Sequence, residues 1–321
     1  MILTDLASGA DAAEVAERIR TAVQEPLTLG DQTLTPTVSV GIATGDAHSP
    51  AEQLLREASL AMRKAKNLGR DQAVFADPTL GVEAEHRIAT ETAIRAGLAE
   101  GAFRPWFQPI VELAHGTVVG YEALARWIRD DGVGLPDDFI SIAARSSLIT
   151  DLDLAMIDPV IAALNGLPDT VFVGLNVTGQ TLSRTPYADL VLASLARQGV
   201  DPRRLHLEVT ETMLLSLDED VIAKMRALAE RGCRWYVDDF GTGYSSISHL
   251  RDLLVTGLKL VKSFTDGIAE GDETSRQLAD ALVGLANGLG LDTVAEGVET
   301  EAQARYLRTL GWRNGQGWLY G

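Results

Sequence analysis

The sequence predicts an α/β protein whose main part is a (β/α)8, TIM-like barrel with one antiparallel strand. From residue 103 onward, apolar strand-like segments alternate with amphipathic helical segments, which is typical of a mostly parallel sheet. Eight strand segments can be distinguished, the number that closes such a barrel. Only the turn Ala114-His115-Gly116 separates the first two strands, so we expect them to pair as a hairpin. A doubly wound open sheet is the alternative, but no G-x-G-x-x-G motif opens the first helix.

The predicted barrel elements follow one another without long interruptions. Strands are expected at 104–113, 118–127, 170–178, 204–212, 234–240, 257–263, 291–298 and 316–320. Helices are expected at 136–148, 151–165, 185–198, 218–231, 245–253, 273–289 and 300–310. Since the chain stops at Gly321, directly after the last strand, we expect the last helix of a complete barrel to be absent.

The N-terminal residues are expected to form only part of an α/β domain. The pattern predicts a helix at 11–24, an alternating strand at 34–42, a helix at 50–66 and a short strand at 72–75. This is too little for a hydrophobic core of its own. Proline and glycine at 76–82 indicate a boundary, followed by a helix at 83–100. We therefore expect a partial domain at 1–77, a linker and leading helix at 78–100, and the barrel at 101–321.

Composition and charge indicate a globular protein and exclude several classes. Hydrophobic residues make up 46% and charged residues 23% of the 321 residues. A net charge of −17 argues against nucleic acid as a partner and against a polybasic membrane anchor, because both need clustered cations. The single cysteine, Cys233, excludes an intrachain disulfide and suits a reducing cytosol. Without a long apolar run or a basic leader we expect a cytoplasmic chain, although a longer parent protein could carry a sensory domain or a membrane anchor.

Polar side chains interrupt seven of the eight predicted strands, in the regions where barrel enzymes carry their functional groups. They are Glu122, Asn176, Glu208, the pair Asp238 and Asp239, Lys259, Glu296 and Gln316. A single buried carboxylate is more often structural than functional. Several carboxylates around one axis, however, raise one another's pKa values, and one lysine cannot neutralise them. We therefore expect bound divalent metal ions.

The donor types narrow the choice of metal. Glu, Asn and Asp supply hard oxygen ligands, whereas the five histidines are scattered and no cysteine pair exists, so Mg²⁺, Mn²⁺ or Ca²⁺ is favoured over Zn²⁺. The adjacent Asp238 and Asp239 indicate two ions, with one carboxylate bridging them. Such a pair activates a water and stabilises the leaving oxygen in phosphoester hydrolysis. The residues alone thus predict a metal-dependent phosphodiesterase or phosphatase.

Seven short motifs also resemble one known family. In chain order they are WFQPIVEL, YEALARW, GLNVT, LEVTE, VDDFGTGYSS, VAEGVE and GQG. Over residues 84–321 the chain resembles the EAL domain of cyclic di-GMP phosphodiesterases. The resemblance implies a barrel with one antiparallel strand, and hydrolysis of cyclic di-GMP to linear pGpG. It also implies two divalent ions, Mg²⁺ or Mn²⁺, with Ca²⁺ as an inhibitor, and a homodimer formed through this domain.

The resemblance assigns roles to the residues that match these motifs. It implies that the metal ligands are Glu122, Asn176, Glu208 and Asp238, with Asp239 on the second ion and near the substrate. Lys259 and Glu296, together with Glu122, would be catalytic and would position or deprotonate the attacking water. The dinucleotide would contact Gln108, Leu124, Arg126 and Gln316, with Arg126 on a phosphate. Glu211, three residues after Glu208 and so on the opposite strand face, would brace the loop after Asp239.

One position departs from the family pattern. The family has Lys-Ile-Asp at the sixth strand, whereas this chain has Lys259-Leu260-Val261. Val261 lies on the same strand face as Lys259, so a carboxylate is missing near the predicted metals. The loss of such an acid typically costs about 10–100-fold in affinity or activity. A cyclic di-GMP receptor that binds its ligand but hardly cleaves it is therefore the alternative to an enzyme.

Residues 1–77 resemble the second half of a GGDEF domain. The resemblance rests on TPTVSVGIATG and LLREASLAMRKAKNLGRDQAVF. The Gly-Gly-Asp-Glu-Phe signature is absent from the chain, which excludes diguanylate cyclase activity for these residues.

Two further features have a structural interpretation beside a functional one. The loop Gly241-Thr242-Gly243 could hold a phosphate, or it could couple metal binding to a dimer surface. His206 alternates with Leu205 and Leu207 and faces the same side as Glu208, and we expect it to be a hydrogen-bonded structural histidine rather than a metal ligand.

Overall fold

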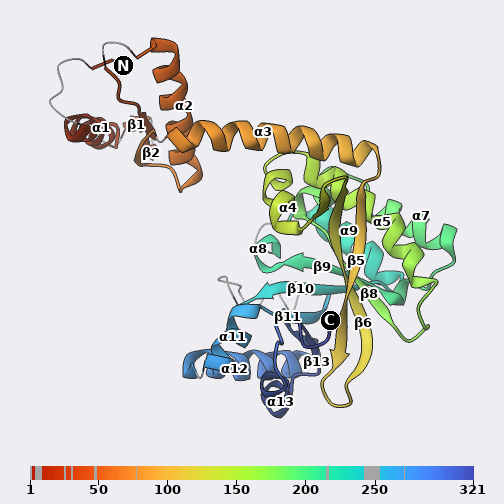
Figure 1. Cartoon of the computed structure of the whole chain (residues 1–321). Helices are drawn as coiled ribbons and strands as arrows, with labels where there is room; N and C mark the ends of the chain where they lie inside the picture. The colour runs from red at the N-terminus through yellow and green to blue at the C-terminus, as the bar shows by residue number, and fades with distance from the viewer. Residues whose placement is uncertain are drawn as a thin grey trace. The chain divides into compact units, whose positions relative to one another are not determined.

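A computed structural model describes residues 2–3, 9–24, 27–29, 32–46, 49–76, 78–214, 217–241, 254–270 and 272–321 (Figure 1). The chain divides into two compact units, Met1–Thr92 and Ala93–Gly321, and each is described by itself. The predicted helix at 245–253 and most of the predicted loop, Thr242 and Gly243, lie outside the described residues. Within the described ranges, no helix combines the length and the apolar character that a membrane crossing requires.

Among its described residues, the N-terminal unit contains most of helix α3 (Pro78–Ala99) and, before it, two helices and two small pairs of strands. They are α1 (Gly9–Val23), α2 (Ala51–Asn67), the antiparallel pair β1 (Leu27–Leu29) and β2 (Gln32–Leu34), and the parallel pair β3 (Val40–Ile42) and β4 (Ala73–Phe75). A Cβ atom on Gly41 would lie 2.0 Å from the Ala58 carbonyl oxygen, so glycine lets α2 pack directly against β3. The single strand predicted at 34–42 is wrong, because Pro36 lies within it and has no N–H to donate to a neighbouring strand.

The second unit is a closed barrel, as predicted. Its strands are β5 (Phe103–Glu112), β6 (Thr117–Arg129), β8 (Phe172–Asn176), β9 (Leu205–Thr210), β10 (Arg234–Phe240), β11 (Val255–Leu260), β12 (Asp292–Ala295) and β13 (Asn314–Gln316). Their order is β5-β13-β12-β11-β10-β9-β8-β6, and the β5–β6 pair closes the sheet. β5 is antiparallel to both of its neighbours, which confirms the predicted hairpin. A short additional strand, β7 (Gly132–Gly134), pairs with β6.

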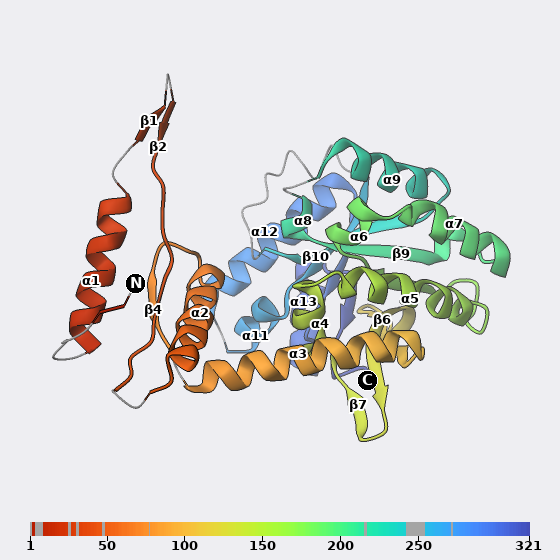
Figure 2. The ribbon, with the colours of Figure 1, turned by 90° about the horizontal axis from the view of Figure 1, so that it is seen from above.

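Helices cover the outside of the barrel. They are α4 (Pro136–Ala144), α5 (Leu148–Leu164), α6 (Gly179–Arg184), α7 (Tyr187–Gln198), α8 (Glu211–Leu214), α9 (Glu219–Glu230), α11 (Lys262–Glu270), α12 (Glu273–Leu289) and α13 (Glu301–Leu310), together with residues 93–99 at the end of α3 (Pro78–Ala99). Helices α5, α7 and α9 contact one another in sequence order and follow the strands round, as Figure 2 shows.

Several predicted boundaries were wrong for local reasons. Helix α3 begins at Pro78 and not at residue 83, because the fixed φ of proline suits the first turn of a helix. Strand β11 ends at Leu260, since α11 begins two residues later. The last strand is Asn314–Gln316 and not 316–320, because the Tyr320 N–H donates to the Gly317 carbonyl and closes a turn.

The hydrophobic core lies between the barrel strands and the outer helices. On β9, Leu205 and Leu207 point outward into this core, where they join Val191 and Leu195 of α7. The alternate residues of the same strand, such as Glu208, therefore face the barrel interior. This alternation places polar side chains inside the barrel without interrupting the core.

Two leucines on α7 allow a direct test of this core. Leu195 is buried, whereas Leu190 is 41% exposed. We expect Leu195→Ala to lower the free energy of unfolding by about 2–5 kcal/mol, because it leaves a cavity in a packed core. Leu190→Ala should lower it by less than about 1 kcal/mol. Urea denaturation of both variants gives the comparison, and equal losses would contradict the described orientation of α7.

Candidate functional site

The predicted site residues converge because their strands are neighbours in the barrel. Cross-strand register places Glu122 of β6 opposite Gln108 of β5, and Glu208 of β9 opposite Asn176 of β8. Parallel strands bring the carboxyl-terminal parts of β6, β8, β9, β10 and β11 to the same end of the barrel. Residues far apart in the sequence thereby form one polar cluster.

Lys259 lies at the centre of this cluster. Its side chain is completely buried, and its Nζ lies 2.8 Å from Glu122 Oε2 and 2.8 Å from Glu208 Oε2. The same ammonium lies 2.7 Å from Glu296 Oε1 and 3.5 Å from Asp238 Oδ1. Burial lowers the pKa of Lys259, but the surrounding carboxylates raise it well above its usual value. The lysine is therefore held as a cation among four acids.

Glu122 is held by three donors from three different strands. Lys259 donates to Oε2, Asn176 Nδ2 donates to Oε1 at 2.7 Å, and Gln316 Nε2 donates to Oε2 at 2.7 Å. Burial acts to raise the pKa of Glu122, but Lys259 and these hydrogen bonds lower it below its usual value. Glu208, by contrast, has a pKa well above its usual range, chiefly because of burial.

A bulge in β10 brings two consecutive carboxylates to the same place. In a regular strand, Asp238 and Asp239 would point to opposite faces of the sheet. The register with β11 shifts between Val237 and Phe240, and Asp239 has a φ of 54°. Ligand oxygens of Asp238, Asp239 and Glu296 consequently lie within 4.8 Å of one another.

Glu296 follows β12, and its pKa is raised close to neutrality. Burial and the nearby acids Asp238 and Glu122 raise its pKa to about 7, although Lys259 acts in the opposite direction. Burial and Asp238 also raise the pKa of Asp239. A carboxylate with a pKa near neutrality can accept a proton at the pH of the cell.

Contrary to the strand predicted at 204–212, Glu211 does not lie on a strand face. Strand β9 ends at Thr210, so Glu211 does not continue the strand but begins the short helix α8. The side chain is buried, and its Oε2 accepts a hydrogen bond of 2.8 Å from the Gly241 N–H. Glu211 therefore holds the residue that follows β10, apart from the central cluster.

The predicted dinucleotide contacts lie on the β5–β6 hairpin and β13. Gln316 Nε2 donates to Gln108 Oε1 at 2.8 Å, and Gln316 Oε1 is buried without a partner among the described residues. Further along β6, Leu124 is in register with Trp106, and Arg126 lies 5.5 Å from the Trp106 ring centroid. Trp106 was not predicted, although the hairpin register offered a way to find it; it is 51% exposed beside Arg126.

The donor set fits hard divalent cations. Oxygen atoms of Glu122, Glu208, Asp238 and Glu296 surround a single ammonium, and Asp239 lies close to Asp238 and Glu296, so the cluster holds more negative than positive charge. Carboxylate and amide oxygens are the ligands that Mg²⁺, Mn²⁺ and Ca²⁺ prefer. The chemistry of the residues present is therefore compatible with the metal ions that the sequence predicts.

The fold and the cluster define a closed (β/α)8 barrel with an acidic, oxygen-rich site at the carboxyl ends of its strands. The family model for the EAL domain matches residues 91–321, and the model for the "Diguanylate cyclase, GGDEF domain" matches residues 1–72. The chain therefore belongs to the EAL domain family. The predicted order, part of a GGDEF domain followed by an EAL domain, is confirmed.

Relatives and solved structures agree with this assignment. The chain is 34% identical to "Cyclic di-GMP phosphodiesterase NbdA" of Pseudomonas aeruginosa over 99% of this chain and 41% of that protein. It is 30% identical to "Bifunctional diguanylate cyclase/cyclic di-GMP phosphodiesterase MucR" of the same organism over 100% of this chain and 48% of that protein. The chain thus spans less than half the length of these two relatives.

Among solved structures, "PaMucR Phosphodiesterase, c-di-GMP complex" has a TM-score of 0.68 and 31% identity, over 73% of this chain and 96% of that chain. The "Klebsiella pneumoniae BlrP1 pH 8.0 calcium/cy-diGMP complex" has a TM-score of 0.60 and 29% identity, over 68% of this chain and 55% of that chain. The first of these structures is a complex with cyclic di-GMP, and the second is a complex with calcium and cyclic di-GMP.

Gly174 of β8 offers a test of how Glu208 is positioned. A Cβ atom on Gly174 would lie 2.0 Å from Glu208 Oε1, so the Gly174→Ala side chain would displace this carboxylate. We expect Mn²⁺ affinity, measured by isothermal titration calorimetry, to fall by about 10–100-fold. Gly166→Ala is the control, because its Cβ would meet only the Ala163 carbonyl oxygen at 3.5 Å. Unchanged Mn²⁺ affinity in Gly174→Ala would show that Glu208 does not bind the ion.

Proposed function

We propose that this chain hydrolyses cyclic di-GMP to linear pGpG with two divalent ions, Mg²⁺ or Mn²⁺. The observation that carries the proposal is the bulge at Asp238 and Asp239, which joins two consecutive carboxylates to the acids around Lys259. The relatives NbdA and MucR are named as cyclic di-GMP phosphodiesterases, and the MucR structure is a complex with cyclic di-GMP. A phosphodiester is also the kind of substrate that an acidic site can bind only through cations.

In this proposal the metal ligands are Glu122, Asn176, Glu208 and Asp238, with Asp239 on the second ion. The bound ions would supply an activated water and stabilise the leaving oxygen. Lys259 positions the attacking water through its ammonium. Glu296, with a pKa of about 7, accepts a proton from that water near neutral pH.

The remaining residues bind and orient the dinucleotide. Gln108 and Gln316 are held together by their own hydrogen bond, which fixes the amide groups that the ligand would meet. Leu124 offers an apolar contact and Arg126 a phosphate contact. Glu211 restrains the chain after Asp239 through the Gly241 N–H. We also propose a cytoplasmic homodimer, with other domains of a longer protein as possible sources of regulation.

A receptor that binds cyclic di-GMP with little cleavage is the second candidate. Val261 favours it, because the position two residues after Lys259 has no carboxylate to share in activating the water. Every other acid named for the catalytic centre is present. The two candidates therefore differ in turnover and not in ligand, so product formation separates them.

The first test measures pGpG by chromatography after incubating the purified chain with cyclic di-GMP and Mn²⁺. The proposal expects product that depends on the metal, and a loss of rate of about 100-fold or more in Glu122→Gln. This variant keeps the shape of the side chain but removes its charge. Tight binding of cyclic di-GMP without product in the unchanged chain would move it to the receptor class.

Val261→Asp tests the effect of the departure from the family pattern. We expect kcat to rise by about 10–100-fold while the Kd for cyclic di-GMP changes little, because the added carboxylate acts on the water and not on the ligand. Val261→Asn is the matched control, since it has the same shape without the charge. An equal rise in both variants, or no rise in either, would remove the argument based on Val261.

A further inference from the structure

A cavity lies at the opposite end of the barrel from the candidate catalytic site. It has a volume of about 830 Å³. Its lining includes the first residues of four strands, Phe172 of β8, Arg234 of β10, Asp292 of β12 and Asn314 of β13. Because the catalytic cluster sits at the carboxyl ends of these strands, the two sites do not overlap. The volume lies in the range of cavities that bind small molecules.

The charge of this basal cavity differs from that of the whole chain. Its lining contains five arginines and four acids, a formal charge of +1, whereas the chain carries −17. The arginines are Arg203, Arg204, Arg234, Arg308 and Arg313, and the acids are Glu112, Asp169, Asp201 and Asp292. A local excess of cations on an acidic protein attracts anions to that place.

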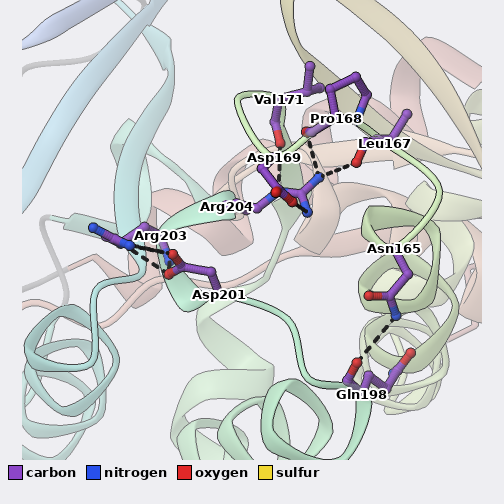
Figure 3. A network of polar contacts seen from close by, with 9 residues as sticks. All are labelled: Asn165, Leu167, Pro168, Asp169, Val171, Gln198, Asp201, Arg203 and Arg204. Carbon is purple, nitrogen blue, oxygen red and sulfur yellow. Dashed lines mark hydrogen bonds and ion pairs between the residues drawn. The ribbon is translucent and has the colours of Figure 1, made fainter.

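Two of the arginines build the wall of the cavity. Arg204 donates to the carbonyl oxygens of Val171, Leu167 and Pro168 at 3.0, 3.0 and 2.8 Å, and Figure 3 shows its guanidinium directed at them. Arg203 pairs with Asp201 through bonds of 2.6 and 3.0 Å. These two guanidinium groups are satisfied within the protein and leave little capacity for a ligand.

The other three arginines outnumber the acidic side chains that could pair with them. Arg234 and Arg313 share a single carboxylate, Asp292, at 3.1 and 3.0 Å. Asp292 also accepts a hydrogen bond of 3.2 Å from the Tyr236 hydroxyl. Arg308 is exposed and makes no ion pair within the described part of the chain. Glu112 also belongs to the lining and forms no ion pair with an arginine among the described residues. Three guanidinium groups and two carboxylates therefore leave an uncompensated charge of about +1, which is the net charge of the lining.

His206 gives an independent indication of a missing partner. It lines the same cavity and is only 3% exposed, yet its Nδ1 is buried without a hydrogen-bond partner among the described residues. The predicted hydrogen bond of this histidine is thus not seen at Nδ1; the ring instead stacks between Phe172 and Tyr236, at centroid distances of 3.8 and 4.8 Å. A buried polar atom without a partner costs about 1–3 kcal/mol. A ligand or a water bound with it in the cavity would supply that partner.

We propose that this basal cavity, formed by Arg234, Arg308, Arg313 and His206, binds a small phosphate-bearing anion. A guanidinium group can donate two parallel hydrogen bonds to a phosphate, and phosphate carries enough negative charge to balance the excess positive charge of the arginines. The binding site requires neither divalent metal nor cyclic di-GMP. The proposal is therefore independent of the catalytic function and can fail or succeed without it.

The test uses the full chain with pyrophosphate as the probe, in EDTA and at fixed ionic strength, so that metal-mediated binding at the catalytic end is excluded. We expect saturable binding by calorimetry with a Kd below about 1 mM. Arg313→Gln and Arg308→Gln should each weaken binding by about 10-fold, since each removes a charged donor. The control is Arg226→Gln, an exposed arginine of α9 outside the cavity lining, which should leave the Kd unchanged.

Two further measurements test whether pyrophosphate binds in the basal cavity. Because Arg308 is exposed and forms no ion pair with the described residues, Arg308→Gln should fold normally even if Arg313→Gln does not. Nuclear magnetic resonance of the imidazole nitrogens should show a shift for His206 on adding pyrophosphate, which binding elsewhere would not produce. Equal affinity of Arg308→Gln and the unchanged chain, or no saturable binding, would overturn the site. Citrate binding as tightly as pyrophosphate would overturn its assignment to phosphate.

Discussion

The buried ammonium of Lys259 is the interaction on which the architecture of the catalytic end depends. Four acids from four different segments lie within 3.5 Å of Nζ, so one cation links β6, β9, β10 and the residue after β12. Burying these carboxylates without a counter-charge would cost several kcal/mol each. Removing the lysine would leave them repelling one another inside a barrel whose outer surface is packed against helices. The lysine thus makes the acidic interior compatible with a stable fold.

The two ends of the barrel carry an excess of opposite charge. At the carboxyl ends, five carboxylates face one lysine, and divalent cations can complete the balance. At the amino-terminal end, Arg234, Arg308 and Arg313 outnumber the carboxylates Asp292 and Glu112, and an anion can complete the balance. Strand alternation produces the first site, because interior positions of each strand alternate with apolar positions that pack outside. The arginines of the second site come instead from the start of β10, from α13 and from the residue before β13. One barrel therefore carries two polar sites of opposite sign without sharing residues.

The barrel was predictable because its signals are local and repeated. Alternating strands and helices, and the short turn at Ala114-His115-Gly116, determine a closed sheet with one antiparallel strand. The polar residues of the cluster were predictable for the same reason, since each interrupts an apolar strand. The bulge at Asp238 and Asp239 was not, because it depends on the register with β11, and neither was the start of α8 at Glu211. The basal cavity escaped prediction because its arginines come from one strand start, a loop and two helices, with no common spacing.

Charge balance also defines what Val261 changes. In the proposed mechanism, Lys259 and two divalent ions would balance the five carboxylates of the cluster, so the ions could be retained without an acid at position 261. Forming a hydroxide from water adds a negative charge to that centre and releases a proton that a base must hold. Glu296, with its pKa raised to about 7, can hold one proton, whereas Val261, the residue directly after β11, offers no second acceptor. In the proposed mechanism, a valine at position 261 would therefore affect the activation of water and not the binding of metal or dinucleotide, which is the property that separates slow turnover from loss of recognition.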